Sequence, residues 1–251
     1  VILALFYALC LVLACPPAWA AEEEKKEKAA PSAPAELKQP VELTTEALQN
    51  RLELVRQAEG LEGDTREQLA NIYQEALTAL EEAKTYAASL EEYEEANRQV
   101  EGRIEALKEK LAEAPPEPEP EVPENASVSD LEQKLSDAQA ELEQAKTEQQ
   151  ELESEQKKRK TRRSEIPGIL TEAQATLEEV KANLEQEPPS DADPVFVAAR
   201  RTRLQARQTK LQNTIAALKA EIQSYDARRE LLPLRQDWTA RRVSRAARKA
   251  Q

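Results

Sequence analysis

The chain has 251 residues, and its 48 Asp and Glu against 35 Lys and Arg give a formal net charge of −13. With no His, two Cys and four Gly, it lacks the ligands of zinc and haem sites, the base of Ser-His-Asp enzymes and the Gly-rich loops of nucleotide-binding folds. We therefore expect no enzyme and no catalytic, cofactor-binding or metal-binding residues. The abundant helix formers instead favour an all-α fold of long antiparallel coiled-coil helices with disordered Pro/Glu-rich linkers.

Residues 1–20 have the pattern of a secretory signal peptide. The apolar run from Val1 to Cys15 is shorter than the roughly 20 residues that a membrane-spanning helix needs, and the sequence up to Ala20 fits a small-x-small cleavage site. A buried apolar helix and a lipoprotein signal at Cys15 remain open as alternatives. Cleavage after Ala20 removes both cysteines, so we expect an exported chain without disulfides in the periplasm or outside the cell.

Prolines divide the rest of the chain into segments. Residues 21–43 are charged and Pro-rich, and they are predicted to be a disordered linker. Residues 114–128 form a second, Pro/Glu-rich linker, which is expected to be extended. Between them, residues 44–113 carry two helical patterns that begin near Thr44 and Asp64, with apolar residues at steps of four and three. We interpret residues 44–113 as a helical coiled-coil segment.

Residues 129–251 are predicted to form an antiparallel helical hairpin. Its first helix opens at Ser129 with a capping box to Glu132, and Pro167 is expected to kink this helix without resetting its phase. The second helix also holds an internal proline, Pro233. Helices of roughly 87 and 85 Å, joined by a short turn, favour antiparallel pairing.

Charge supports the same pairing. Residues 130–155 hold nine acidic and two basic residues, and residues 228–251 hold eight basic and two acidic ones, so the stem of the hairpin brings opposite charges together. Polar residues at seam positions are expected to fix the register at a cost in stability. These are Asn97, Gln149, Gln156, Arg159 and Arg163.

Three runs in the hairpin carry a resemblance to a known family: Arg162–Leu170, Glu221–Asp226 and Arg229–Trp238. They resemble the periplasmic helical region, or MscS porin domain, of large mechanosensitive ion channels of the MscS/MscK type. The resemblance implies a domain whose full-length protein continues into membrane helices and a heptameric, tension-gated pore. No pore residue carries over to this chain, and we expect the sequence to be truncated at its C-terminus.

Two basic stretches could bind a partner. Lys157 to Arg163 is similar to a nucleic-acid patch, but export and the net negative charge favour a solvated helix face, with a contact to lipopolysaccharide, anionic lipid or peptidoglycan as the alternative. Arg228 to Lys249 is interpreted as the basic side of the stem rather than as a lipid-binding segment. Trp238 and Tyr225 are interpreted as packing residues rather than as stacking platforms for a ligand.

The sequence and the resemblance together predict an extracytoplasmic coiled-coil accessory domain of a mechanosensitive ion channel, active in osmotic-shock protection and without the pore itself. The expected partners are other copies or channel subunits, in a heptamer if the resemblance holds, and envelope components, but no nucleic acid. We expect the full-length protein to be attached to the membrane. The alternative is a free periplasmic coiled-coil scaffold or adaptor, such as a cell-wall hydrolase activator or an efflux adaptor hairpin. An enzyme is disfavoured because a rod of helices offers no concave site.

Overall fold

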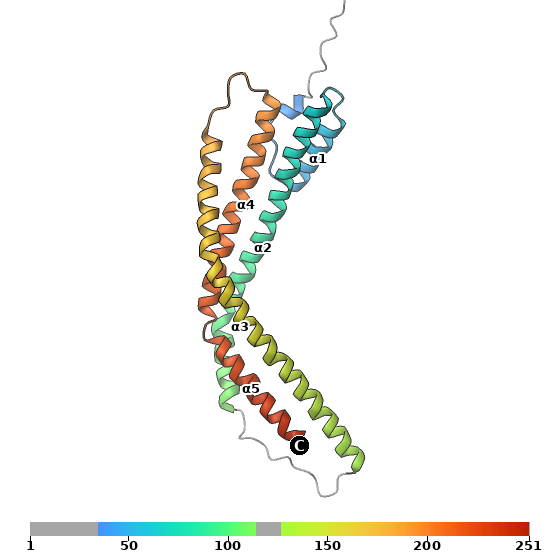
Figure 1. The fold of residues 1–251 in the computed structure, drawn as a ribbon, viewed down its shortest axis with the longest axis vertical. Coiled ribbons are helices and arrows are strands. Elements are labelled where there is room, and N and C mark those ends of the chain that lie inside the picture. The colour runs from blue at the N-terminus through green and yellow to red at the C-terminus, as the bar shows by residue number, and fades with distance from the viewer. Residues whose placement is uncertain (1–34, 114–126, 251) are drawn as a thin grey trace, which may run out of the picture.

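The computed structural model describes residues 35–113 and 127–250, and every regular element in these residues is helical (Figure 1). The predicted all-α fold is confirmed. The predicted signal peptide and most of both predicted linkers lie outside the described residues. The elements are a 3-10 turn, η1 (Ala35–Lys38), followed by α1 (Thr45–Gln57), α2 (Gly63–Glu113), α3 (Val128–Glu185), α4 (Pro194–Ala227) and α5 (Leu231–Lys249).

Side-chain caps mark the starts of α1 and α3. Thr44 caps α1 at the predicted position. The predicted capping box of Ser129 with Glu132 is wrong, because the box that starts α3 is formed by Ser127 and Asp130. The Asp130 amide donates to the Ser127 hydroxyl (3.2 Å), and the Ser127 amide donates back to the Asp130 carboxylate (3.3 Å). These hydrogen bonds satisfy two amides at the end of the helix, where no helical carbonyl can reach them.

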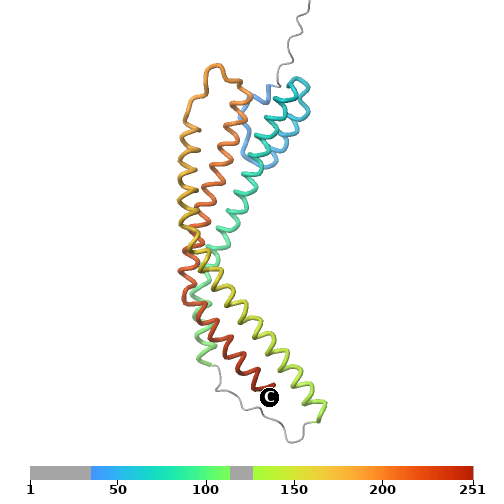
Figure 2. Tube along the Cα trace, viewed as in Figure 1, coloured from blue at the N-terminus to red at the C-terminus, as the bar shows by residue number. Residues whose placement is uncertain are grey.

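The long helices lie side by side around a central column formed by α4 followed by α5 (Figures 1 and 2). α2 packs along one side of this column and α3 along the other. α2 runs parallel to the column because α3 reverses the direction of the chain between them. Two ion pairs at a spacing of seven residues mark the parallel register of α2 and α4: Glu75 with Arg203, at 2.9 Å, and Glu82 with Lys210.

The main hydrophobic core lies at the end of the molecule that holds α1. Leu48, Leu52 and Val55 of α1 are buried against the first turns of α2, where Leu69 and Tyr73 are fully buried. The same core includes three buried residues of α4: Val195, Ala199 and Ala206. The sequence was interpreted as giving residues 44–113 a coiled-coil segment of their own. In the structure this segment shares its core with α4.

The predicted linker over residues 21–43 also contributes to this core in its described part. Leu37, in η1, is fully buried in the same cluster, and η1 packs against α4. Glu36 accepts a hydrogen bond at its backbone oxygen from the Arg51 guanidinium of α1. The sequence pattern gave no sign of this contact, because a single Leu among charged residues and prolines has no periodicity.

The second helix of the predicted hairpin is broken into α4 and α5 by the turn at residues 228–230. Pro233 has no amide hydrogen to donate to the carbonyl of Arg229, and its ring crowds that carbonyl, which favours a break in the helix at this point. Pro233 itself sits in the first turn of α5, where a missing amide hydrogen costs nothing. Pro167, by contrast, lies inside α3, which continues past it and changes direction partway along its length (Figure 2).

Candidate functional site

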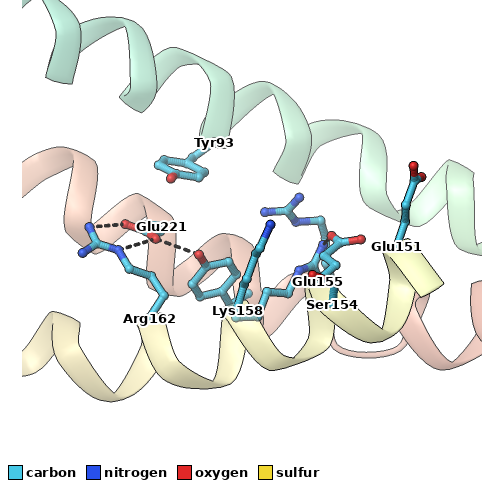
Figure 3. A pocket seen from close by; sticks show the side chains of 10 residues that line it. Tyr93, Glu151, Ser154, Glu155, Lys158, Arg162 and Glu221 are labelled. Carbon is cyan, nitrogen blue, oxygen red and sulfur yellow. Dashed lines mark hydrogen bonds and ion pairs between the residues drawn. The ribbon is translucent and has the colours of Figure 1, made fainter. Parts of the chain in front are cut away.

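A polar cleft of about 600 Å³ lies where α2 and α3 meet the end of α4 (Figure 3). α2 supplies Tyr93, α3 supplies Arg159 and Arg162, and the end of α4 supplies Glu221 and Tyr225. These residues are joined by Arg228, from the turn between α4 and α5, and we call the six side chains the junction cluster. The cluster sits at the break in the central column, between the two halves of the molecule (Figure 1).

The centre of the junction cluster is a buried carboxylate. Glu221 is 4% exposed, and both of its oxygens accept hydrogen bonds from Arg162, with Nε at 3.0 Å from Oε1 and Nη2 at 3.2 Å from Oε2. The Tyr225 hydroxyl donates to Oε1 as well, at 2.7 Å. A fork-like pair of this kind, supported by a third donor, compensates the cost of removing a charge from water.

The pKa values in the cluster shift in the directions that this arrangement predicts. The hydrogen bond to Glu221 raises the pKa of Arg162, since it stabilises the charged guanidinium. Burial raises the pKa of Tyr225, and the neighbouring carboxylate raises it further because it opposes a second negative charge. Burial followed by the charge of Glu221 raises the pKa of Tyr93 in the same way.

A second set of contacts surrounds this buried carboxylate. Arg159 pairs with Glu155 one turn earlier on α3, and its guanidinium lies 5.9 Å from the centre of the Tyr225 ring, within range of a cation–π interaction. Arg163 pairs with Asp226 at 2.6 Å. The Arg162–Leu170 and Glu221–Asp226 runs, which carry the family resemblance, are thus joined to each other by two ion pairs between α3 and α4.

Below the cleft, α3 and α5 are joined by three ion pairs at a spacing of seven residues, which we call the charge ladder. Arg235 lies 3.4 Å from Glu155, and the other two pairs are Arg242 with Glu148 and Lys249 with Glu141, the last at 2.9 Å. Successive steps move forward along α5 and backward along α3, so the two helices are antiparallel. The predicted pairing of residues 130–155 with residues 228–251 is confirmed.

The predicted basic patch from Lys157 to Arg163 divides between the surface and the cleft. Lys157, Lys158, Lys160 and Arg163 are exposed, as expected for a solvated helix face, and Lys158 also lines the edge of the cleft. Arg159 and Arg162 are half-buried and belong to the junction cluster. Periodicity alone did not separate these two groups, because a run of basic residues covers every face of a helix.

The residues predicted to fix the register have different environments. Gln156 bonds to Gln236 across α3 and α5 at 3.3 Å, whereas Arg163 is exposed. Gln149 is half-buried, and the side-chain oxygen of Asn97 is buried without a hydrogen-bond partner among the described residues. Trp238 is half-buried on α5.

The sequence analysis did not identify Glu221 as the centre of the junction cluster. Its partner, Arg162, lies 59 residues earlier, and no spacing rule for a single helix connects the two positions. Within the described residues there is no group of three or more His, Cys, Asp or Glu side chains placed to hold a metal ion. None of the helices in that part of the chain combines the length and the apolar character needed to cross a membrane.

Comparison with known proteins gives one match. A family model described as the mechanosensitive ion channel porin domain matches residues 51–251, a range that includes α2 to α5 and the whole junction cluster. No curated protein and no solved structure matches the chain.

Proposed function

Because the chain belongs to the mechanosensitive ion channel porin domain family, we propose that it is an extracytoplasmic accessory domain of a mechanosensitive ion channel that protects cells from osmotic shock. The family match over residues 51–251 is the observation that carries this proposal. In this proposal the domain does not contain the conducting pore, which belongs to membrane-spanning parts of the channel.

The structure supports a mechanical or docking role rather than a conducting one. The long helices expose charged side chains along much of their length, and the cleft at the junction is lined by charged and hydroxyl-bearing residues. The central column is broken at residues 228–230, while α2 and α3 pass alongside without a break. A domain with one defined joint can transmit a displacement between its ends.

Self-association is part of the proposal. Channels of this family are oligomeric, so several copies of the domain are brought together when each is attached to a channel subunit. A heptamer is the assembly that we propose, together with a contact to envelope components. The predicted signal peptide over residues 1–20 supplies the route to the periplasm.

The test compares a channel that carries this domain with the same channel lacking residues 51–251, by patch-clamp recording under graded membrane tension. We expect the deletion to change the tension needed for opening and to leave the single-channel conductance unchanged. A changed conductance would show that the domain contributes to the pore. An unchanged threshold together with normal survival of hypo-osmotic shock would remove the accessory role.

The alternative of a free periplasmic scaffold makes a different prediction. A scaffold should cross-link in cells to cell-wall or efflux proteins and not to channel subunits. A photo-reactive residue at Lys157, which is exposed on α3, can report the neighbour without disturbing the junction cluster. Cross-links to a channel subunit support the proposal, and cross-links confined to other envelope proteins favour the scaffold.

A further inference from the structure

The cleft at the junction holds more positive charge than its internal ion pairs neutralise. Arg162 is paired with Glu221, and Arg159 is paired with Glu155. Lys158 lines the same cleft, and its side chain forms no ion pair or hydrogen bond with any other described residue. Figure 3 shows its side chain extending from α3 across the cleft toward α2, the helix that carries Tyr93.

Arg228 supplies a second unneutralised cation to the cleft. It is half-buried, and the only hydrogen bond of its side chain to a described residue runs from Nε to the backbone oxygen of Ser224, at 3.2 Å. Burial lowers the pKa of Arg228, and the positive charge of Arg159 lowers it further. Its two terminal nitrogens form no ion pair or hydrogen bond with another described residue, although the charge of Glu155 opposes the effect of Arg159 on the pKa of Arg228.

Tyr93 adds a neutral donor to the two cations. Its side chain descends from α2 into the cleft (Figure 3), and its hydroxyl forms no hydrogen bond with another described residue. The cleft therefore offers three kinds of donor: the ammonium of Lys158, the guanidinium of Arg228 and the phenol of Tyr93. Such a set suits a negatively charged group with several acceptor oxygens. A phosphate has that chemistry, and Arg and Lys are the side chains that proteins use most to bind it.

We propose that this cleft binds a phosphate group through Lys158, Arg228 and Tyr93. The volume of about 600 Å³ accommodates a phosphate together with part of the molecule that bears it. Glu151 also lines the cleft, at the end away from Arg162 (Figure 3), and its carboxylate opposes an anion. The bound group is either a free phosphate compound or the headgroup of an anionic lipid, since both present the same oxygens.

Calorimetric titration of the 251-residue chain with inorganic phosphate, at constant ionic strength, tests the proposal. We expect saturable binding at one site per chain and roughly tenfold weaker binding for Lys158→Gln and for Arg228→Gln, since each removes a charged hydrogen bond. Glu151→Gln should tighten binding about twofold to threefold because it removes the opposing charge. Lys160→Gln is the matched control, as an exposed lysine two residues away that does not line the cleft.

Vesicles distinguish the two sources of the phosphate. Binding to phosphatidylglycerol vesicles but not to phosphatidylcholine vesicles, lost in Lys158→Gln, identifies a lipid headgroup, whereas binding of inorganic phosphate alone identifies a soluble compound. If neither probe binds, or if Lys160→Gln weakens binding as much as Lys158→Gln, the proposal is wrong. Equal affinity for acetate overturns it as well. Arg228→Lys keeps the positive charge and should retain more binding than Arg228→Gln, which separates a loss of the charge from a loss of folding. Binding is measured without a channel, so the outcome does not depend on the proposed function.

Discussion

Arg162 and Glu221 are 59 residues apart in the sequence, yet their side chains form a two-pronged ion pair across α3 and α4 with N–O distances of 3.0 and 3.2 Å. Glu221 is almost completely buried, and Arg162 is the cation that balances it. The pair fixes the lengthwise position of α3 against α4 at the point where the central column is broken. Its loss should therefore affect both the stability of the molecule and the alignment of its two halves.

Glu221→Gln should lower the free energy of unfolding by about 2 kcal/mol, because it removes the two charged hydrogen bonds from Arg162 and leaves that partly exposed guanidinium with only Glu165, at 3.9 Å, as a counter-charge. Urea denaturation followed by circular dichroism measures the change. Glu151→Gln is the control, since Glu151 is exposed at the same cleft, and its effect should stay below about 0.5 kcal/mol. Equal losses in the two variants would contradict a special role for the buried pair.

The charge ladder predicts a rescue by charge exchange. Glu148→Arg and Arg242→Glu should each destabilise the stem by about 1 kcal/mol, because each places like charges opposite one another at a partly buried position. The double variant should recover most of that loss, since the pair is restored with its signs exchanged. Thermal unfolding of all four proteins gives the coupling energy, and additive losses would show that Glu148 and Arg242 do not interact.

Tyr225 should make stability depend on alkaline pH. Its pKa is raised in the folded state, so its contribution is complete below the unfolded value of about 10 and is lost as the pH rises toward the folded value. Tyr225→Phe removes the hydrogen bond to Glu221 and should cost about 1 kcal/mol near neutral pH. The gap between wild type and variant should shrink above about pH 10. A gap that stays constant up to about pH 11 argues against this linkage.

Leu37 tests whether the segment before α1 belongs to the folded core. Leu37→Ala should cost about 2–4 kcal/mol, because the side chain is fully buried and its removal leaves a cavity. A residue in a free linker would give no loss. Leu135→Ala serves as the comparison, since Leu135 is 42% exposed and should lose less than about 1 kcal/mol.

Export predicts a mature chain that begins at Ala21. N-terminal sequencing of the protein recovered from the periplasmic fraction checks the cleavage site, and the absence of free thiols after denaturation checks that Cys10 and Cys15 have been removed. A protein that keeps both cysteines and stays in the cytoplasm would refute the signal-peptide interpretation. A lipid-modified N-terminus at Cys15 would support the lipoprotein alternative instead.

Periodicity and charge predicted the parts of the fold that are local or repetitive. The apolar steps along residues 44–113 and 129–251 located the long helices, and the opposite charges of the stem gave the pairing of α3 with α5. The resemblance of three short runs to the porin domain family is confirmed by the family match. These features could be predicted from the sequence because each depends on neighbours within one helix or on the summed charge of a segment.

The remaining features depend on contacts between distant segments. The packing of α2 against α4 and the burial of Leu37 join stretches that have no sequence signal in common. The pair of Arg162 with Glu221 is of the same kind, since many Arg and Glu residues could form such a pair and only the packing selects two of them. The break before Pro233 was not predicted for a local reason, because one proline is compatible with a helix that continues or with a new helix start.

The break at residues 228–230 interrupts only the middle of three neighbouring helices. A pull applied at the two ends should therefore be carried mainly along α2 and α3, which pass the break without interruption, while the ion pairs of α4 and α5 with α3 limit any change in the angle between α4 and α5. Because the side chains around Glu221 connect α3 to the end of α4 at this break, we expect the angle between the two halves to vary more when that ion pair is lost.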